Sequence, residues 1–337
     1  MITAPTPSLS TGVMLASMVV AAASRDVRGQ DEGRAGHARE SAVVEQLATP
    51  AASLLLAADG PDAQRFVVVG GGAERDPAVI WRTTDGGRTF AAAKLPPITR
   101  RLYDVRFVDG RLGFACGLGA TLLRTRNGGA TWESVMVPCK DAWLASVAFV
   151  DEKLGIVVGA HAGPLLLWTE DGGDTWTRGE IPGPLAKDTN NVRDVLMLDR
   201  RHGIACGDGG LLLRTVDGCR SWQRLESGST AWLRHLAFVD HEHGFLVAGD
   251  GQVLATDDGG ATWTARGKVP GKANSVLFRT PHEGYVVTMD GLLCSTADGG
   301  RTFREEHRHR FELCDLVALG EKTLCVGGNG FAGWLTR

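Results

Sequence analysis

An eight-residue motif of the form Thr-x-Asp-Gly-Gly-x-Thr-Trp returns six times, with small variations, along this chain of 337 residues. The copies begin at Thr83, Thr125, Thr169, Thr215, Thr256 and Thr296, at intervals of 40 to 46 residues. Each motif follows three short apolar segments with the composition of β-strands. A repeat of about 40–45 residues made of strands and turns has the period of a four-stranded propeller blade. The chain is therefore predicted to be all-β, with antiparallel four-stranded blades.

The number of blades follows from the two ends of the repeat region. Seven repeats account for residues 42–337, and the last repeat has three strand segments but no motif and no fourth strand. Residues 42–47, Ala-Val-Val-Glu-Gln-Leu, have the pattern of the missing strand. We expect this N-terminal strand to complete the last blade of a seven-bladed β-propeller, which would leave no open sheet edge.

The motif itself is predicted to be a tight turn between the third and fourth strands of a blade. Its acidic residue can accept hydrogen bonds from backbone amides, and its two glycines can adopt a positive φ. A structural role is assigned to the residues at this position, Asp85, Asn127, Asp171, Asp217, Asp258 and Asp298. In the fourth copy Cys219 replaces the second glycine, so we expect this turn to be the most strained and the least regular.

The innermost strand of most repeats carries a polar residue near its start. The residues are Asp104, Ser146, Asp194, His235, Ser275 and Asp315, and repeat alignment places Leu54 at the same position in the first repeat. Two interpretations remain open. The side chains could line the mouth of the central channel, with Asp104, Asp194, His235 and Asp315 as the candidates. Alternatively, they could hydrogen-bond backbone groups between blades.

The first 41 residues have a different composition. Residues 13–23 form an apolar and small-residue stretch, so residues 1–24 are a candidate signal peptide, although no Lys or Arg precedes the stretch. Residues 25–41 are charged and glycine-bearing, which is typical of a disordered linker. Export to the periplasm or the extracellular space is expected, with a cytoplasmic location as the alternative.

Composition excludes several classes of function. The chain has 36 Lys and Arg against 39 Asp and Glu, a near-balance that disfavours nucleic-acid binding. No apolar run reaches the ~20 residues of a membrane-spanning helix. The seven cysteines include no CxxC pair, and the histidines of 241–243 and 307–309 fall in variable connections between strands. We expect no metal and no cofactor.

The octets at 169–176 and 256–263 resemble the Asp-box (BNR) repeat, and the whole unit is similar to the photosystem II assembly and stability factor family over residues 42–337. This resemblance implies a seven-bladed propeller and a non-enzymatic scaffold or assembly factor. It also implies an exported protein that binds a protein partner, such as a membrane-protein precursor, through an arginine-rich face. The chain is expected to act as a monomer without a membrane span.

Basic and aromatic residues gather in the segments that lead into the innermost strands. The candidates for partner binding are Arg100, Arg101, Trp143, Arg193, Trp232, Arg234, Lys272, Arg308 and Arg310. Arginines with aromatic neighbours suit an acidic protein segment, because a guanidinium can pair with a carboxylate through two hydrogen bonds.

The alternative function is a secreted glycan-binding or glycoside hydrolase-like propeller, because enzymes also carry the Asp-box. A sialidase needs an arginine triad and a Tyr–Glu nucleophile pair, whereas this chain has only Tyr103 and Tyr285. Tyr285 falls at a position that holds Phe114 and Phe245 in other repeats, which is typical of a core residue. We therefore predict no catalytic residue and no enzymatic activity.

Overall fold

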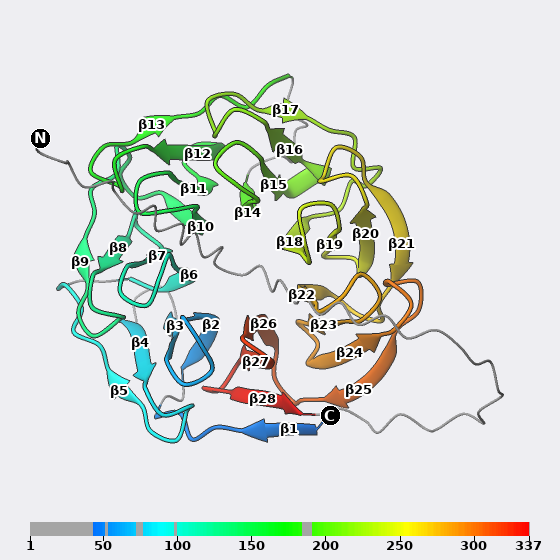
Figure 1. Ribbon diagram of the computed structural model, residues 1–337, viewed down its shortest axis with the longest axis horizontal. Helices are drawn as coiled ribbons and strands as arrows, with labels where there is room; N and C mark the ends of the chain where they lie inside the picture. The colour runs from blue at the N-terminus through cyan, green and yellow to red at the C-terminus, as the bar shows by residue number, and fades with distance from the viewer. Residues whose placement is uncertain (1–42, 51–52, 72–76, 98–99, 184–190, 337) are drawn as a thin grey trace, which may run out of the picture.

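Seven four-stranded antiparallel sheets radiate from a central axis, as Figure 1 shows. The computed structural model describes residues 43–50, 53–71, 77–97, 100–183 and 191–336. The predicted signal peptide and linker lie outside the described residues. Within the described part, the one helix is a three-residue 3-10 turn, η1 (Asp208–Gly210), so none has the length and hydropathy needed to cross a membrane.

Each blade consists of strands a to d, from the axis outward. The a strands are β2 (Leu54–Asp59), β6 (Leu102–Phe107), β10 (Trp143–Phe149), β14 (Val192–Met197), β18 (Leu233–Phe238), β22 (Ala273–Phe278) and β26 (Leu313–Leu319). The b strands are β3 (Phe66–Gly71), β7 (Gly113–Gly117), β11 (Gly155–Ala160), β15 (Gly203–Gly207), β19 (Gly244–Ala248), β23 (Gly284–Thr288) and β27 (Lys322–Gly327).

The two outer strands carry the motif between them. The c strands are β4 (Ala78–Thr83), β8 (Leu122–Thr125), β12 (Pro164–Thr169), β16 (Leu212–Thr215), β20 (Gln252–Thr256), β24 (Leu292–Thr296) and β28 (Ala332–Thr336). The d strands are β5 (Ala91–Ala92), β9 (Glu133–Ser134), β13 (Thr177–Arg178), β17 (Gln223–Arg224), β21 (Thr264–Lys268), β25 (Arg304–Arg308) and β1 (Val43–Gln46). Blades are numbered 1 to 7 in the order of their a strands.

The ring closes as predicted. Strand β1, from the start of the described chain, pairs antiparallel with β28 from its end, with Val43 opposite Thr336 and Gln46 opposite Gly333. Figure 1 shows β1 as the outermost strand of the sheet that contains β26, β27 and β28. The pairing covers the edge that strand c of the last blade would otherwise expose to other chains.

Neighbouring blades pack through apolar side chains of their inner strands. Phe114 of blade 2 stacks on Phe149 of blade 3 with ring centroids 3.7 Å apart, and Phe245 of blade 5 stacks on Phe278 of blade 6 at 3.4 Å. These rings belong to buried clusters that each span two adjacent blades. The core is therefore a series of layers between blades, and each layer holds two blades at a set angle.

The six motifs form nearly identical turns. In the third copy the Thr169 hydroxyl donates to Asp171 Oδ1 (2.7 Å) and accepts from the Gly173 N–H (3.0 Å). The Asp171 carboxylate accepts from the N–H of Thr175 (2.9 Å) and from its hydroxyl. The leading threonine, to which the sequence analysis assigned no role, is thus as central to the turn as the aspartate.

The fourth copy departs from the others at its tryptophan. Cys219 adopts a φ of 71°, in the left-handed region that favours glycine, and its N–H still donates to Thr215 Oγ1 (3.2 Å). Trp132, like the tryptophans that close the third and fifth copies, donates from Nε1 to the carbonyl of the second glycine, at 3.1 Å. Trp222 Nε1 is buried without a hydrogen-bond partner among the described residues. Cys219 thus carries the backbone strain expected of this turn, whereas the hydrogen bonds of Asp217 match those of the aspartates in the other copies.

One detail of the sequence alignment was wrong. The pairing with strand b places Ala57, not Leu54, at the position of Asp104, because Ala57 lies opposite Val69 as Asp104 lies opposite Cys116. The first blade therefore has no polar side chain at this position. The local pattern misled the alignment because the start of β2 is apolar at several successive residues.

Candidate functional site

Each innermost strand has a β-bulge near its start, where one residue is skipped in the pairing with strand b. A bulge turns its side chain away from the regular alternation of the strand. The bulge residues are Leu56, Tyr103, Ala145, Arg193, Arg234, Asn274 and Cys314, and all seven line one cavity of about 210 Å³. We call this cavity the central cup.

Two tryptophans flank the Arg193 guanidinium beside the cup. Its central carbon lies 5.7 Å from the ring centroid of Trp143 and 5.0 Å from that of Trp232. Trp143 also packs edge-on against Tyr103, and Trp232 is 55% exposed. Arg193 Nε donates to the carboxylate of Asp208 in η1, which holds the arginine in place. Cation–π contacts and this ion pair together give the cup a rigid aromatic wall.

Arg234 is the least neutralised cation of the cup. Its Nη2 donates to Asn274 Oδ1 (2.6 Å), and no carboxylate of the described residues forms an ion pair with it. Burial, and then the neighbouring charge of Arg193, lower the pKa of Arg234. A cation whose charged form is disfavoured in this way gains stability from any anion that enters the cup.

Two cup residues have a buried donor without an acceptor. Trp143 Nε1 and Arg234 Nε have no hydrogen-bond partner in the described structure; Arg101 Nε also has none but lies outside the cup lining. Buried polar atoms are usually hydrogen-bonded, and leaving one unpaired costs about 1–3 kcal/mol. Both of the cup atoms are donors, so a ligand in the cup that satisfied them would have to carry hydrogen-bond acceptors.

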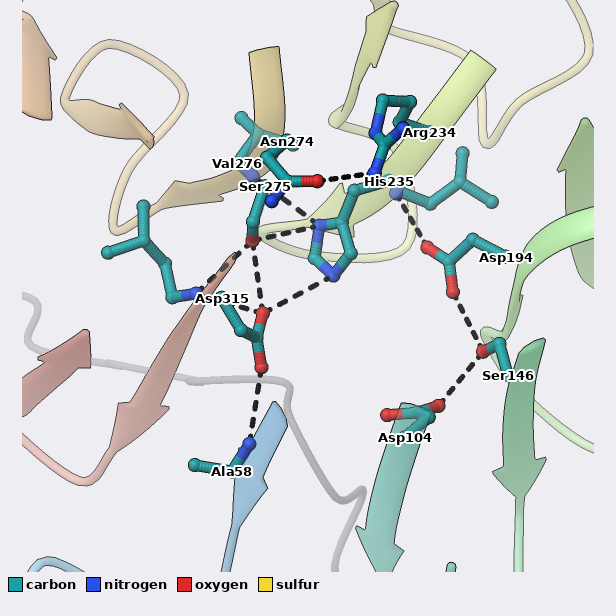
Figure 2. A network of polar contacts seen from close by, with 12 residues as sticks. Ala58, Asp104, Ser146, Asp194, Arg234, His235, Asn274, Ser275, Val276 and Asp315 are labelled. Carbon is teal, nitrogen blue, oxygen red and sulfur yellow. Dashed lines mark hydrogen bonds and ion pairs between the residues drawn. The ribbon is translucent and has the colours of Figure 1, made fainter. Parts of the chain in front are cut away.

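Below the cup's rim, polar side chains connect successive blades, as Figure 2 shows. Asp104 Oδ2 accepts from the Val147 N–H (3.0 Å), and Asp194 Oδ2 accepts from the Leu236 N–H (2.8 Å). Three further links follow the same pattern, from His235 to Val276, from Ser275 to Leu316 and from Asp315 to Ala58. We call Asp104, Ser146, Asp194, His235, Ser275 and Asp315 the polar ring. All of them except Ser146 bond a backbone N–H of the next blade, and all except Ser275 line the cup.

Blade 1, which lacks a polar residue at this position, uses a different residue. Asp59, two positions further along β2, accepts from the Phe107 N–H of blade 2 (2.6 Å). Arg106 lies near it and forms an ion pair with Asp104 (3.5 Å). Burial raises the pKa of Asp59 to about 6, against the influence of Arg106. Charged groups therefore extend from the polar ring further into the central channel.

Ser146 bridges two carboxylates. Its Oγ lies 3.0 Å from Asp104 Oδ2 and 2.8 Å from Asp194 Oδ1. A serine hydroxyl has one proton to donate, so both contacts are hydrogen bonds only when one carboxyl is protonated. Burial raises the pKa of Asp104, which favours that protonation.

The predicted basic residues are not equivalent in the structure. Arg193 and Arg234 line the cup with Trp143, whereas Arg100 pairs with Asp141 (3.8 Å) at an exposed position. Arg308 ends strand β25 at the outer edge of blade 6 and pairs with Glu305 (3.1 Å), so it does not share the loop position assigned from the sequence. Lys272 and Arg310 are exposed in the connections before β22 and β26.

Several cup residues were missed by the sequence analysis. Tyr103, Asn274 and Cys314 line the cup because they occupy the bulge, and Glu312 and Arg106 line it from nearby positions. Their shared signal is position relative to the polar ring: Tyr103, Asn274 and Cys314 lie one residue before a ring residue, Arg106 lies two after Asp104, and Glu312 lies three before Asp315. A bulge that all repeats share is hard to detect in the sequence. The extra residue lies near the start of the strand, and the apolar pattern of the residues after it is unchanged.

The described residues contain no group of three or more His, Cys, Asp or Glu side chains arranged to hold a metal ion. His243 contacts the Asp240 carboxylate, and the His309 ring packs at a tilt against Phe311 and Phe331. Both histidines therefore contact neighbouring protein side chains. Tyr285 is buried in the core between blades 6 and 7, at the position that its repeat alignment indicated.

Comparisons with known proteins agree with this architecture. The family model for photosynthesis system II assembly factor YCF48 matches residues 88–188, 126–229 and 220–307. The structure of YCF48 from Cyanidioschyzon merolae superposes with a TM-score of 0.69 at 18% identity, over 87% of this chain and 98% of that one. YCF48 bound to a D1 peptide gives a TM-score of 0.68 at 17% identity, over 88% and 97%.

The structural similarity extends beyond that family. The WD40 propeller domain of Doa1 superposes with a TM-score of 0.69 at 10% identity, over 88% of this chain and 97% of that one. Because unrelated propellers superpose equally well, these structures show the fold alone. No curated protein matches the sequence significantly.

Proposed function

Because the chain belongs to the photosynthesis system II assembly factor YCF48 family, we propose that it is a non-enzymatic assembly factor whose central cup receives an acidic segment of a protein partner. The observation that carries the proposal is the set of unpaired buried donors around Arg234 and Trp143. The D1 peptide in the related YCF48 structure supports a peptide as the kind of ligand.

The cup would recognise such a segment through charge and stacking. A carboxylate placed beside Arg234 would pair with a guanidinium that no described carboxylate now neutralises. Trp232, more than half exposed next to Arg193, would cover an apolar residue of the same segment. Buried arginine and tryptophan at the centre of a contact surface usually carry most of the binding energy.

Peptide binding tests the proposal directly. We expect an acidic peptide to bind in fluorescence anisotropy, and the same peptide with its acidic residues changed to amides to bind at least ~10-fold more weakly. The variant Arg234→Gln should weaken binding by about 10-fold or more, because its partner carboxylate would lose its cation. Arg308→Gln is the matched control, since Arg308 lies at the outer edge and is already paired with Glu305.

Equal affinity of the wild type and Arg234→Gln for the acidic peptide would exclude the cup as the site. Reversing charge at Arg101, Arg193 and Arg234 together should abolish capture. Arg193→Glu would also face Asp208 and disturb η1, so the single Arg234 variant is the sharper test. Purified protein should not hydrolyse sialosides or xyloglucan, and turnover lost on changing one Asp or Glu would contradict a non-enzymatic role.

The cellular setting is a second part of the proposal. The apolar stretch at residues 13–23 supports export of the chain, which would place the cup where a membrane-protein precursor exposes its segments. N-terminal sequencing of the protein from its native host would show cleavage near residue 24. An intact Met1 on a cytoplasmic protein would contradict export.

A further inference from the structure

A second cavity lies between blades 1 and 2, at the face that holds the motif turns. The a–b connections and the motif turns meet there, since the Gly128 N–H donates to the Arg111 carbonyl (2.9 Å). The cup lies at the other end of the innermost strands, where b–c and d–a connections meet. This second cavity has a volume of about 270 Å³ and contains Arg65, Arg82 and Arg111 in its lining. We call it the arginine pocket.

The arginines come from three separate segments. Arg65 precedes strand β3, Arg82 lies in strand β4, and Arg111 lies in the connection between β6 and β7. No acidic side chain lines the pocket. Arg65 is paired with Asp62 (2.7 Å), whereas neither Arg82 nor Arg111 has an ion pair with any residue in the described ranges. Two cations therefore remain without a counter-charge.

The motif turn that lines this pocket is the only one of the six that lacks an acidic residue at its third position. Asn127 keeps the turn, because its Oδ1 accepts from the Thr131 N–H (3.0 Å) and its Nδ2 donates to the Thr131 hydroxyl (2.9 Å). The turn is thus intact, but it lacks the negative charge that an aspartate would carry at position 127. In the other five copies a hydrogen-bonded carboxylate stands there, and hydrogen bonding favours its ionised form.

The junction between blades 2 and 3 contains an equivalent arginine whose charge is neutralised. Arg124 occupies the position of Arg82 one blade on, and each guanidinium donates to a glycine carbonyl of the following motif turn. Arg124 also bonds Glu133 (2.8 Å) and Asp174 (3.0 Å). The corresponding residues beside Arg82 are Ala91 and Ala130. The equivalent arginine is therefore neutralised at one junction and, among the described residues, left without a counter-charge at the other.

We propose that the arginine pocket binds a phosphate-type oxyanion. Arginine donors from separate segments suit the several oxygens of a tetrahedral phosphate, because each planar guanidinium can make two parallel hydrogen bonds. Asn127 at the pocket wall removes the carboxylate that would repel such an anion. The pocket is remote from the cup, so this binding is independent of the peptide site.

Calorimetric titration with inorganic phosphate, at constant ionic strength set with chloride, tests the proposal. We expect the wild type to bind phosphate, and Arg82→Gln to reduce the affinity at least ~10-fold. Asn127→Asp should reduce it by a similar factor, and this variant restores the residue of the other five motif turns, so the turn is expected to fold. Arg126→Gln is the control, since it removes an exposed arginine from the same turn but outside the pocket lining.

Two further titrations sharpen the ligand class. Acetate should bind at least ~10-fold more weakly than phosphate, because a carboxylate has only two oxygens to share among the arginines. Glycerol 3-phosphate binding more tightly than inorganic phosphate would assign the site to phosphate esters, and the reverse would assign it to the free ion. No phosphate binding by the wild type, unchanged affinity in Asn127→Asp, or equal affinity for acetate would overturn the proposal.

Discussion

Aspartates of the polar ring and aspartates of the motif turns show how position decides what one residue type does. In the turns, Asp85, Asp171 and Asp298 are close to solvent and accept hydrogen bonds from a threonine hydroxyl, which lower the pKa of each to about 2. At the centre, burial raises the pKa of Asp104, and that of Asp59 to about 6. The turn carboxylates hold one local loop, whereas the central carboxylates bridge different blades.

The two groups therefore respond to pH in opposite directions. A turn aspartate has a lower pKa folded than unfolded, so its contribution to stability is present above about pH 4 and lost as the pH falls toward 2. Asp59 has a higher pKa folded than unfolded, so stability is greatest below about pH 4 and falls as the pH rises through 6. Acid should thus weaken the motif turns while it relieves the cost of the buried Asp59 carboxylate at the centre.

The largest expected difference comes from removing one aspartate of each kind. Asp194→Ala should lower the free energy of unfolding by about 3 kcal/mol, because the buried N–H groups of Val195 and Leu236 and the Ser146 hydroxyl lose an acceptor. Asp171→Ala should cost about 1 kcal/mol, because water can replace the exposed acceptor. Urea unfolding monitored by circular dichroism measures both, and equal costs would contradict the distinction between ring and turn.

An intermediate effect is expected from Asp59→Asn. The pKa shift of Asp59 corresponds to about 3 kcal/mol of destabilisation at neutral pH. The asparagine keeps the acceptor for the Phe107 N–H but brings a buried NH₂ group, so we expect a net gain of about 2 kcal/mol at pH 8. At pH 4 the gain should be absent, because Asp59 is then protonated. A gain of the same size at both pH values would show that titration of Asp59 is not its cause.

The smallest effect distinguishes two turns from each other. Trp132→Phe should cost about 1 kcal/mol, because the Nε1 bond to the Gly129 carbonyl is lost. Trp222→Phe should cost nothing or stabilise slightly, because it removes a buried donor without a partner, and Phe90 and Phe303 stand at this position in two other copies. Thermal unfolding measures the stability of the two variants. A larger loss of stability for Trp222→Phe than for Trp132→Phe would contradict the interpretation that Trp222 Nε1 has no hydrogen-bond partner.

The candidate site was predictable in part. The sequence indicated Arg193, Arg234 and Trp143 as neighbours because each stands at the start of an innermost strand, and the structure places them in one cup. The sequence did not distinguish these residues from Arg308. Arg308 also lies among charged residues in the sequence, but it belongs to β25, at the outer edge of blade 6. Nor did it distinguish Arg82 from Arg124, since their difference depends on which residues stand across a blade junction.

The repeat alone determined the number of blades, the four strands of each and the closure of β1 onto β28. Each copy contains its own apolar strand segments and glycine turn, so the pattern can be recognised within a single repeat. Only the tertiary structure decided which polar residues meet. The bulge that aims Arg234 into the cup depends on the pairing of β18 with β19 within blade 5. The bond from Asp59 to blade 2, and the lack of an ion pair for Arg82 among the described residues, depend on contacts between blades. Such contacts join residues that are about 40 or more positions apart, and no single repeat carries their pattern.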